Sequence, residues 1–390
     1  MAAPPLLTAW MYDKEKSLDW IQLLRGVAAL LVVLTHARYA LLNTDNFPMA
    51  QQLFMPGAMG VDLFFIISGF IMCHSTAGSD GSFGYVARFA IKRFARVWPV
   101  YLVATLLSVF GINGGIDYFH DAANRLAFWH SIGMLPANPR YMPYFMLTLQ
   151  VGWTLEFEMY FYLVFAISML FRRLRWLALG AWILLTVILL PLSQRGFDMD
   201  ITRDLGSAVG YMSIVTSPFV LEFAAGVLIG WLYRQAWFRI GNRQAAWHAI
   251  GLGVAFALWS IYCGAVSTHG PTQFGWPLAL MVLLMALASK TVQIRVPALC
   301  IWLGSMSYSL YLTHQISQSL VTHAMGLADV SPLAHSWGFI FVSSAFALSF
   351  AALSHRWLEQ GLALVVRDAL LRLLPGRPPE LHVVREAKRA

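Results

Sequence analysis

An arginine and a histidine stand eleven residues apart in the stretch RGVAALLVVLTH, residues 25–36, and the residues between them are almost all apolar. On an α-helix, eleven residues make three turns plus about 20°, so Arg25 and His36 share one face, roughly 16 Å apart along the axis. Taken singly, they could be an arginine that reaches the lipid headgroups and an interfacial histidine. Because a charge inside a membrane helix is costly, the shared face favours a cation and a proton acceptor lining one cavity.

Two further stretches place charges beside apolar residues. RFAIKRFARVWPVY, residues 88–101, contains Arg93 and Arg96. They are either anchors at the cytoplasmic surface or part of a phosphate site, since guanidinium forks suit phosphate oxygens. WTLEFEMYFY, residues 153–162, places Glu156 and Glu158 on different faces of an apolar helix. A buried carboxylate needs a partner, and a histidine would serve.

Two other stretches give weaker signals. In GVDLFFIISGFIM, residues 60–72, Asp62 is either an acid near a helix N-terminus or a substrate contact, and Gly69 favours close helix approach. In LGSMSYSLYLTH, residues 303–314, His314 is expected at about the depth of His36. Tyr311 and His314 are candidate substrate contacts, and the alternative for such polar residues is hydrogen bonding between helices.

The elements that must position these residues are membrane-spanning helices. The 390-residue chain is 58% hydrophobic and 12% charged, whereas a soluble protein is about a quarter charged. The pattern predicts an all-α polytopic bundle with about ten spanning segments. They lie near residues 18–41, 57–75, 97–112, 144–171, 175–193, 211–233, 246–266, 274–290, 298–322 and 336–358.

The distribution of lysine and arginine predicts the orientation of this bundle. With both termini in the cytoplasm, most of the basic residues fall on the cytoplasmic side. The exceptions outside the first helix are Arg38, Arg125, Arg140, Arg195 and Arg203. Topology therefore explains the net charge of +8, and we expect no nucleic-acid partner. The three cysteines lie in apolar segments without metal-ligand spacing, so no metal site is expected.

Taken together, these stretches resemble the acyltransferase-3 family of integral membrane acyltransferases, from Leu18 to about Gln360. The spaced arginine and histidine of the first helix are the most telling feature, and Arg93, Arg96 and Glu158 match later motifs. HRWLEQ, residues 355–360, is similar to the family's last-helix ending. A second acid often follows the glutamate directly; here that residue is Met159, which leaves the role of Glu156 open. Within the family, the motif sequences are most similar to the branch that acetylates exopolysaccharides.

This resemblance implies three parts: a cytoplasmic segment 1–17, a transmembrane acyltransferase domain 18–362 and a basic cytoplasmic tail 363–390. It implies transfer of an acyl group, by default acetyl, from acetyl-CoA to a hydroxyl of a surface or exported glycan or lipid-linked saccharide. Arg25, Arg93 and Arg96 would bind the donor. His36 would be the catalytic base or carry a transient acyl group, and Glu158 would orient it. The implied location is the bacterial inner membrane, among membrane lipids and polysaccharide assembly machinery.

A secondary transporter or flippase for a lipid-linked sugar is the alternative class. Such a protein would also have about ten helices, buried charges and a cavity near the membrane midplane. The basic motif joined to a same-face Arg25 and His36 pair favours the enzyme, because a transporter has no need of that combination.

Overall fold

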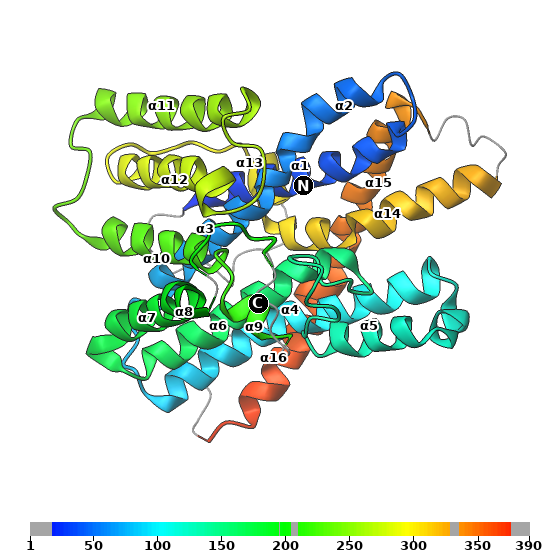
Figure 1. The fold of residues 1–390 in the computed structure, drawn as a ribbon. Helices are drawn as coiled ribbons and strands as arrows, with labels where there is room; N and C mark the ends of the chain where they lie inside the picture. The colour runs from blue at the N-terminus through cyan, green and yellow to red at the C-terminus, as the bar shows by residue number, and fades with distance from the viewer. Residues whose placement is uncertain (1–17, 195, 204–209, 328–334, 376–390) are drawn as a thin grey trace, which may run out of the picture.

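The computed structural model describes residues 18–194, 196–203, 210–327 and 335–375, and this part of the chain is helical with no strand (Figure 1). The predicted all-α class is confirmed. The α-helices are α1 Asp19–Ala37, α2 Phe47–Phe54, α3 Gly60–Ser75, α4 Phe83–Gly111, α5 Ala122–Ile132, α6 Trp153–Met169, α7 Arg175–Ile183, α8 Leu190–Gln194, α9 Met212–Val215, α10 Val220–Arg234, α11 Arg243–Tyr262, α12 Trp276–Ser289, α13 Ala298–Ser305, α14 Ser307–Leu327, α15 Trp337–Ser354 and α16 Ala363–Arg372.

Within the described residues, seven helical stretches are long and apolar enough to cross a membrane. They are Asp19–Leu41, Phe47–Ser75, Phe83–Gly111, Arg172–Gln194, Arg243–Tyr262, Pro271–Ser289 and Trp337–Arg372. The other three predicted segments contain α6, α10 and the pair α13–α14. α6 and α10 have only 17 and 15 residues, and α14 is rich in serine and threonine. The protein is thus a helical membrane protein, while the count of ten spans and the orientation stay predictions.

Two segment boundaries differ from those predicted. α4 begins at Phe83, not near residue 97, and the Ser82 side chain accepts a hydrogen bond from the Tyr85 N–H at its start. The basic residues of 88–96 are good helix formers, so they extend this helix. At the other end of the chain, α15 continues through a π-helix, His355–Leu362, into α16. The predicted division between domain and tail at residue 362 falls inside this continuous helix.

Glycines let the helices that carry the charged residues approach closely. A β-carbon at Gly60 would lie 2.4 Å from the Ala28 carbonyl oxygen, so α3 packs directly on α1. α13 meets α1 in the same way, because a β-carbon at Gly304 would lie 2.1 Å from the Gln22 carbonyl oxygen. The close approach predicted for Gly69 is present, against the Phe223 carbonyl of α10. These contacts fix α1 and α3 relative to each other.

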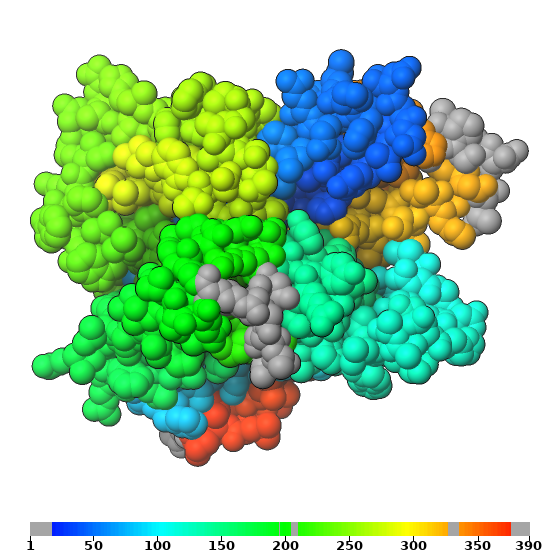
Figure 2. All heavy atoms as spheres, in the orientation of Figure 1, coloured from blue at the N-terminus to red at the C-terminus, as the bar shows by residue number. Residues whose placement is uncertain are grey.

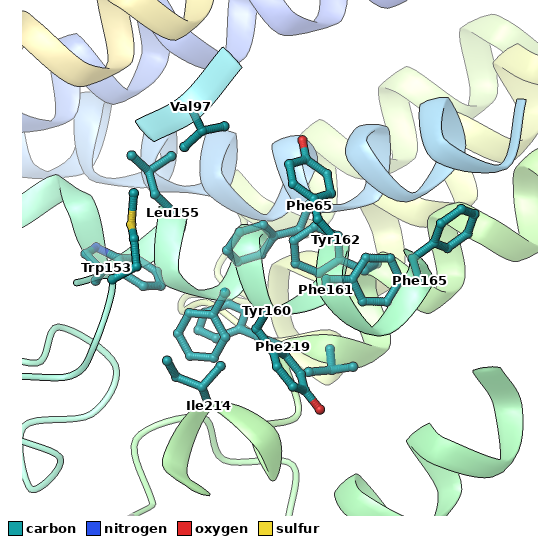
Figure 3. Packing of buried hydrophobic residues seen from close by; sticks show 14 of the residues in the cluster. Phe65, Val97, Trp153, Leu155, Tyr160, Phe161, Tyr162, Phe165, Ile214 and Phe219 are labelled. Carbon is teal, nitrogen blue, oxygen red and sulfur yellow. The ribbon is translucent and has the colours of Figure 1, made fainter. Parts of the chain in front are cut away.

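Aromatic side chains fill the space between α3, α6 and α10 (Figure 3). The Phe65 ring lies 4.6 Å from that of Phe223 and 5.3 Å from that of Phe219, centroid to centroid, and Trp153 packs on the same cluster. The space-filling view shows α5 and the residues before it, in cyan to turquoise, standing out at one side of this packed body (Figure 2). The close-packed core holds α6, and with it Glu158, against α3.

The contact between α3 and α10 gives a test of this packing. A β-carbon at Gly226 would lie 2.0 Å from the Ile66 carbonyl oxygen, which belongs to the backbone and cannot move aside cheaply. We expect Gly226→Ala to destabilise the protein by about 1–3 kcal/mol, as overpacking does, and to lower the Tm of the purified protein in detergent. Gly251→Ala on α11 is the control, because nothing lies within 4 Å of its β-carbon position. Equal Tm values for the two variants would contradict this packing.

Candidate active site

A cavity that is partly open to solvent lies between α1, α3, α4, α6 and α14, and it has about 720 Å³ of empty space when that open part is included. α3 lines it from Val61 to Ile71, which spans about 15 Å of helix. Its polar lining consists of Arg25, Ser68, Arg93, Arg96, Thr154, Glu158, Tyr162, Tyr308 and Tyr311, and its apolar lining of Val61, Phe64, Phe65, Ile67, Ile71, Val97 and Leu155. The structure therefore brings Arg25, Arg93, Arg96, Glu158 and Tyr311 together, from four different helices.

Three of these residues are arginines. Arg25 comes from α1, and Arg93 and Arg96, three residues apart on α4, share one helix face. The Arg93 guanidinium donates to the Ser75 hydroxyl at 3.2 Å and lies 5.4 Å from the Tyr162 ring centroid. Ser75 ends α3, so Arg93 marks one end of the cavity. Three guanidinium groups around one cavity are suited to bind phosphate or another polyanion.

Glu158 faces these arginines. Its carboxylate accepts hydrogen bonds from the Ser68 hydroxyl at 3.2 Å and from the Tyr162 hydroxyl. No contact between Glu158 and His36 is present among the described residues, so the predicted pairing of the two is not seen. The prediction paired Glu158 with His36 by chemical type alone. In the structure Glu158 lies at the level of Ser68 on α3 and lines the cavity, whereas His36 does not. Glu158 is a counter-charge within the arginine cavity.

His36 instead contacts His314. The His36 Nδ1 lies 2.9 Å from the Val32 carbonyl oxygen and 3.2 Å from the His314 Nε2 (rings 4.8 Å apart), and the His314 Nδ1 lies 2.6 Å from the Tyr311 carbonyl oxygen. A carbonyl can only accept, so both Nδ1 atoms carry the hydrogen. The His314 Nε2 is then an acceptor, and His36 keeps a lone pair on its own Nε2. The contact agrees with the equal depth expected for the two histidines.

Tyr311 separates this histidine pair from the cavity. Its ring lies 5.9 Å from the Phe64 ring and 6.0 Å from the His314 ring. Its hydroxyl donates to the Val151 carbonyl at 3.1 Å and accepts from Thr154 at 2.9 Å. His314 is completely buried and does not line the cavity. Contact with a substrate therefore suits the Tyr311 ring, whereas His314 acts on His36.

Asp62 lies outside the cavity and is fully buried. One of its oxygens lies 2.6 Å from the His269 Nδ1, and the other accepts the Gly270 N–H at 2.9 Å. Glu222 is buried close by, and its Oε1 lies 2.6 Å from the β-carbon position of Gly275. Both oxygens of Asp62 are thus engaged within the protein, and it holds the connection before α12 in place.

Sequence reasoning did not find several of these polar residues. His269 lies in a connection 207 residues from Asp62, and no pattern in the sequence joins them. Glu222 was passed over within an apolar segment, although a lone acid there was a usable signal. Glu359 was noted only as part of a motif. Glu156, left open above, is buried at 1% exposure and has no hydrogen-bond partner in the described part of the chain.

The described residues thus form a helical membrane bundle whose cavity is lined by three arginines, with a pair of histidines in contact beyond Tyr311. The chain matches the acyltransferase-3 domain over residues 18–355 and belongs to that family. It is therefore a membrane acyltransferase, which transfers acyl groups.

Named relatives agree with this assignment. The chain is 34% identical to the exopolysaccharide production protein ExoZ of Rhizobium meliloti (strain 1021) over 281 residues, 70% of this chain and 80% of that protein. It is 26% identical to the acyltransferase MdmB of Streptomyces mycarofaciens, over 91% of this chain and 92% of that protein. It is also 26% identical to nodulation protein 10 of Rhizobium leguminosarum bv. viciae, over 80% of this chain and 84% of that protein. No solved structure matches the chain.

The surroundings of Asp62 lead to a prediction. Asp62→Asn would place an amide N–H against the N–H of His269, so we expect a loss of stability of about 3 kcal/mol, typical of a broken buried pair. The Tm of the purified protein should fall, and the KM values of the remaining folded enzyme should stay close to those of the wild type. Asp117→Asn is the control, because its pairing with His120 is exposed to solvent. A stable Asp62 variant with a raised acceptor KM would show instead that Asp62 contacts the substrate.

Proposed function

We propose that the protein transfers an acetyl group from acetyl-CoA to a hydroxyl group of a surface or exported glycan. The observation that carries the proposal is the convergence of Arg25, Arg93 and Arg96 on one cavity, with the free Nε2 of His36 beyond its other end. The name of the Rhizobium relative supports a polysaccharide acceptor, since that protein takes part in exopolysaccharide production. Membership in a family of acyltransferases favours this function over the transporter alternative.

The donor would enter with its phosphates toward Arg93 and Arg96. Coenzyme A carries its phosphate groups on the nucleotide and its thioester at the end of a long, flexible arm. The cavity follows α3 for about 15 Å, from the phosphate-binding end beside Ser75 toward Thr154 and Tyr311. Arg25 lines the same cavity and would hold the pyrophosphate or the arm. The donor would therefore lie along α3, with the acyl group toward the histidine pair.

His36 would act as the base. Its Nε2 takes the proton of the acceptor hydroxyl as that oxygen forms a bond with the thioester carbonyl carbon. The carbon–sulfur bond then breaks, and the departing thiolate of coenzyme A receives the proton. A route through a transient acyl-imidazole uses the same Nε2 and the same leaving group. The Val32 carbonyl and His314, rather than Glu158, would hold His36 in the required tautomer.

This function requires the donor and the acceptor to approach from opposite sides of the membrane. We infer that the Arg93 end faces the cytoplasm of a bacterial inner membrane, with both termini on that side, as the basic residues indicate. The exposed turn at Gly78 then faces inward. In cells whose exposed Cys263 has been replaced, a cysteine introduced at position 78 should resist an impermeant reagent. Labelling from outside would reverse this orientation.

The base assignment predicts the effect of His36→Ala. Membranes incubated with labelled acetyl-CoA should transfer label to glycan in the wild type, and the variant should lose about 10²–10⁴-fold in kcat, as expected for a lost general base. Donor binding should change little, because the imidazole is needed mainly in the transition state. His248→Ala, on the exposed part of α11, is the control. Normal transfer in the His36 variant would rule out the base, and solute movement without labelling would support transport.

The donor assignment predicts the effect of Arg93→Lys and Arg96→Lys. An ammonium keeps the charge and loses the fork that binds two phosphate oxygens. We expect the apparent KM for acetyl-CoA to rise about tenfold in each variant, equivalent to one lost charge-assisted contact, with protein abundance unchanged. Arg88→Lys, on the same helix and outside the cavity, should behave as wild type. If all three variants have wild-type donor kinetics, Arg93 and Arg96 are only topological anchors.

A further inference from the structure

We propose that Glu359 is a positioning residue for the reaction: it caps the N-terminus of α14 and thereby sets Tyr308, Tyr311 and His314. The expected kinetic effects rest on the proposed function, whereas the cap itself rests on the geometry alone. Glu359 belongs to the π-helix between α15 and α16, far in sequence from α14. None of the roles assigned above uses this residue.

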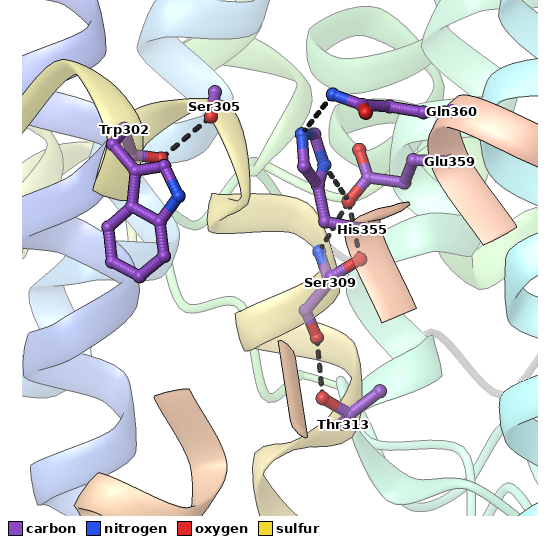
Figure 4. Close-up of polar contacts among 7 residues, drawn as sticks. All are labelled: Trp302, Ser305, Ser309, Thr313, His355, Glu359 and Gln360. Carbon is purple, nitrogen blue, oxygen red and sulfur yellow. Dashed lines mark hydrogen bonds and ion pairs between the residues drawn. The ribbon is translucent and has the colours of Figure 1, made fainter. Parts of the chain in front are cut away.

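The carboxylate of Glu359 meets the first turn of α14. Its Oε1 accepts from the Ser309 backbone N–H at 3.1 Å and from the Ser309 hydroxyl at 2.5 Å (Figure 4). α13 ends at Ser305, and the first turn of α14 begins at Ser307, with the Leu310 N–H bonded to the Met306 carbonyl. The Ser309 N–H therefore has no partner within its own helix. Glu359 supplies that partner from a neighbouring helix, as a capping side chain does.

A π-helix makes this cap possible. His355 Nδ1 lies 3.1 Å from Glu359 Oε1, and His355 Nε2 lies 2.9 Å from Gln360 Nε2, so one imidazole contacts two consecutive side chains (Figure 4). The Gln360 amide nitrogen can only donate, so the His355 Nε2 accepts, while the Nδ1 lies in contact with the carboxylate without the geometry of a hydrogen bond. Short π-helical segments occur often at functional sites. In this π-helical segment, Glu359 contacts both His355 and Ser309.

This cluster is not a nucleophilic triad. In such a triad the serine hydroxyl donates to the histidine, and the histidine donates to the carboxylate. Here the Ser309 hydroxyl donates directly to Glu359, which lies between Ser309 and His355. Ser309 is also fully buried and does not line the cavity. The arrangement holds α14 in place and does not activate an oxygen.

The position of α14 matters because this helix joins the two parts of the site. Tyr308 and Tyr311 line the arginine cavity, and Tyr308 also donates to the Val97 carbonyl of α4 at 2.8 Å. His314, five residues after the capped Ser309, contacts His36. A rotation of α14 would therefore change the cavity wall and the histidine contact together. Glu359 also places a negative charge close enough to act on Arg25 and Arg96.

The two effects of Glu359 can be separated by substitution. Glu359→Gln keeps an oxygen for the cap and removes the charge. We expect its kcat to stay within about threefold of wild type and its KM for acetyl-CoA to fall, because the cavity becomes more positive. Glu359→Ala removes the cap as well, and kcat should fall at least about tenfold. Asp368→Asn on α16 removes a surface carboxylate and should change neither constant.

A readout that does not depend on acyl transfer tests the cap directly. Diethyl pyrocarbonate modifies free imidazole nitrogens, and mass spectrometry measures the rate at each histidine. His314, completely buried in the wild type, should react faster in Glu359→Ala and at the wild-type rate in Glu359→Gln. Unchanged His314 reactivity in Glu359→Ala would overturn the proposal whatever the enzyme acylates. Equal losses of kcat in the Ala and Gln variants, with the KM for acetyl-CoA raised in both, would also overturn the proposal. That result would indicate general structural damage, whereas the proposal expects a lower KM in Glu359→Gln.

Discussion

The convergence of three half-buried guanidinium groups on one cavity inside a membrane protein constrains everything else in this structure. Such charges are costly in hydrocarbon and persist only where the protein supplies opposite charge and hydrogen-bond acceptors. Glu158 supplies one negative charge within the cavity, and Glu359 supplies a second beside it. Three cations and two anions leave an excess of positive charge. An anionic donor would complete the balance, so the charges of the cavity complement the ligand that the proposed reaction needs.

Close helix packing makes this concentration of charge possible. The arginines come from two helices, and a small shift of either would separate them. Gly60 and Gly304 place α3 and α13 directly on the backbone of α1, and Gly69 and Gly226 do the same between α3 and α10. Contacts of backbone on backbone leave little freedom to slide. Glycines therefore fix the position of the helix that carries Arg25. The charged residues are positioned by this packing and not by their own interactions.

Much of the site could be predicted from the sequence, for identifiable reasons. Arg25 and His36 stand out because a charge within an apolar run is rare, and helical periodicity gives their common face. Counting residues from the ends of the apolar segments gave the depth of His314, and the structure places it against His36. Depth counting works because a membrane helix has a fixed rise per residue and a fixed thickness to cross.

The pairings that failed or were missed depend on information that one helix does not contain. Glu158 was assigned to His36 because carboxylates often orient histidines, but the rotation of α6 turns it toward Ser68 and Tyr162. The partner of Asp62 lies in a connection with no periodicity at all. Glu359 reaches Ser309 from a π-helical segment, and no pattern in the sequence predicts that segment. Sequence periodicity therefore predicts which residues share a face of one helix. Which residues of other helices pack against that face is known only from the assembled bundle.

The neutral partner of His36 fits the chemistry better than the carboxylate that the sequence suggested. A carboxylate would stabilise the imidazolium, whereas in the proposed function the proton passes on to the departing thiolate. The Val32 carbonyl fixes the tautomer of His36, and His314 lies 3.2 Å from its Nδ1 without adding negative charge. Glu158 and Glu359 lie near the cavity arginines, so in the proposed function they would act on the donor site instead. In the proposed function the tasks are therefore divided: arginines and glutamates would balance the charge of the donor, and the two imidazoles would accept and release the proton.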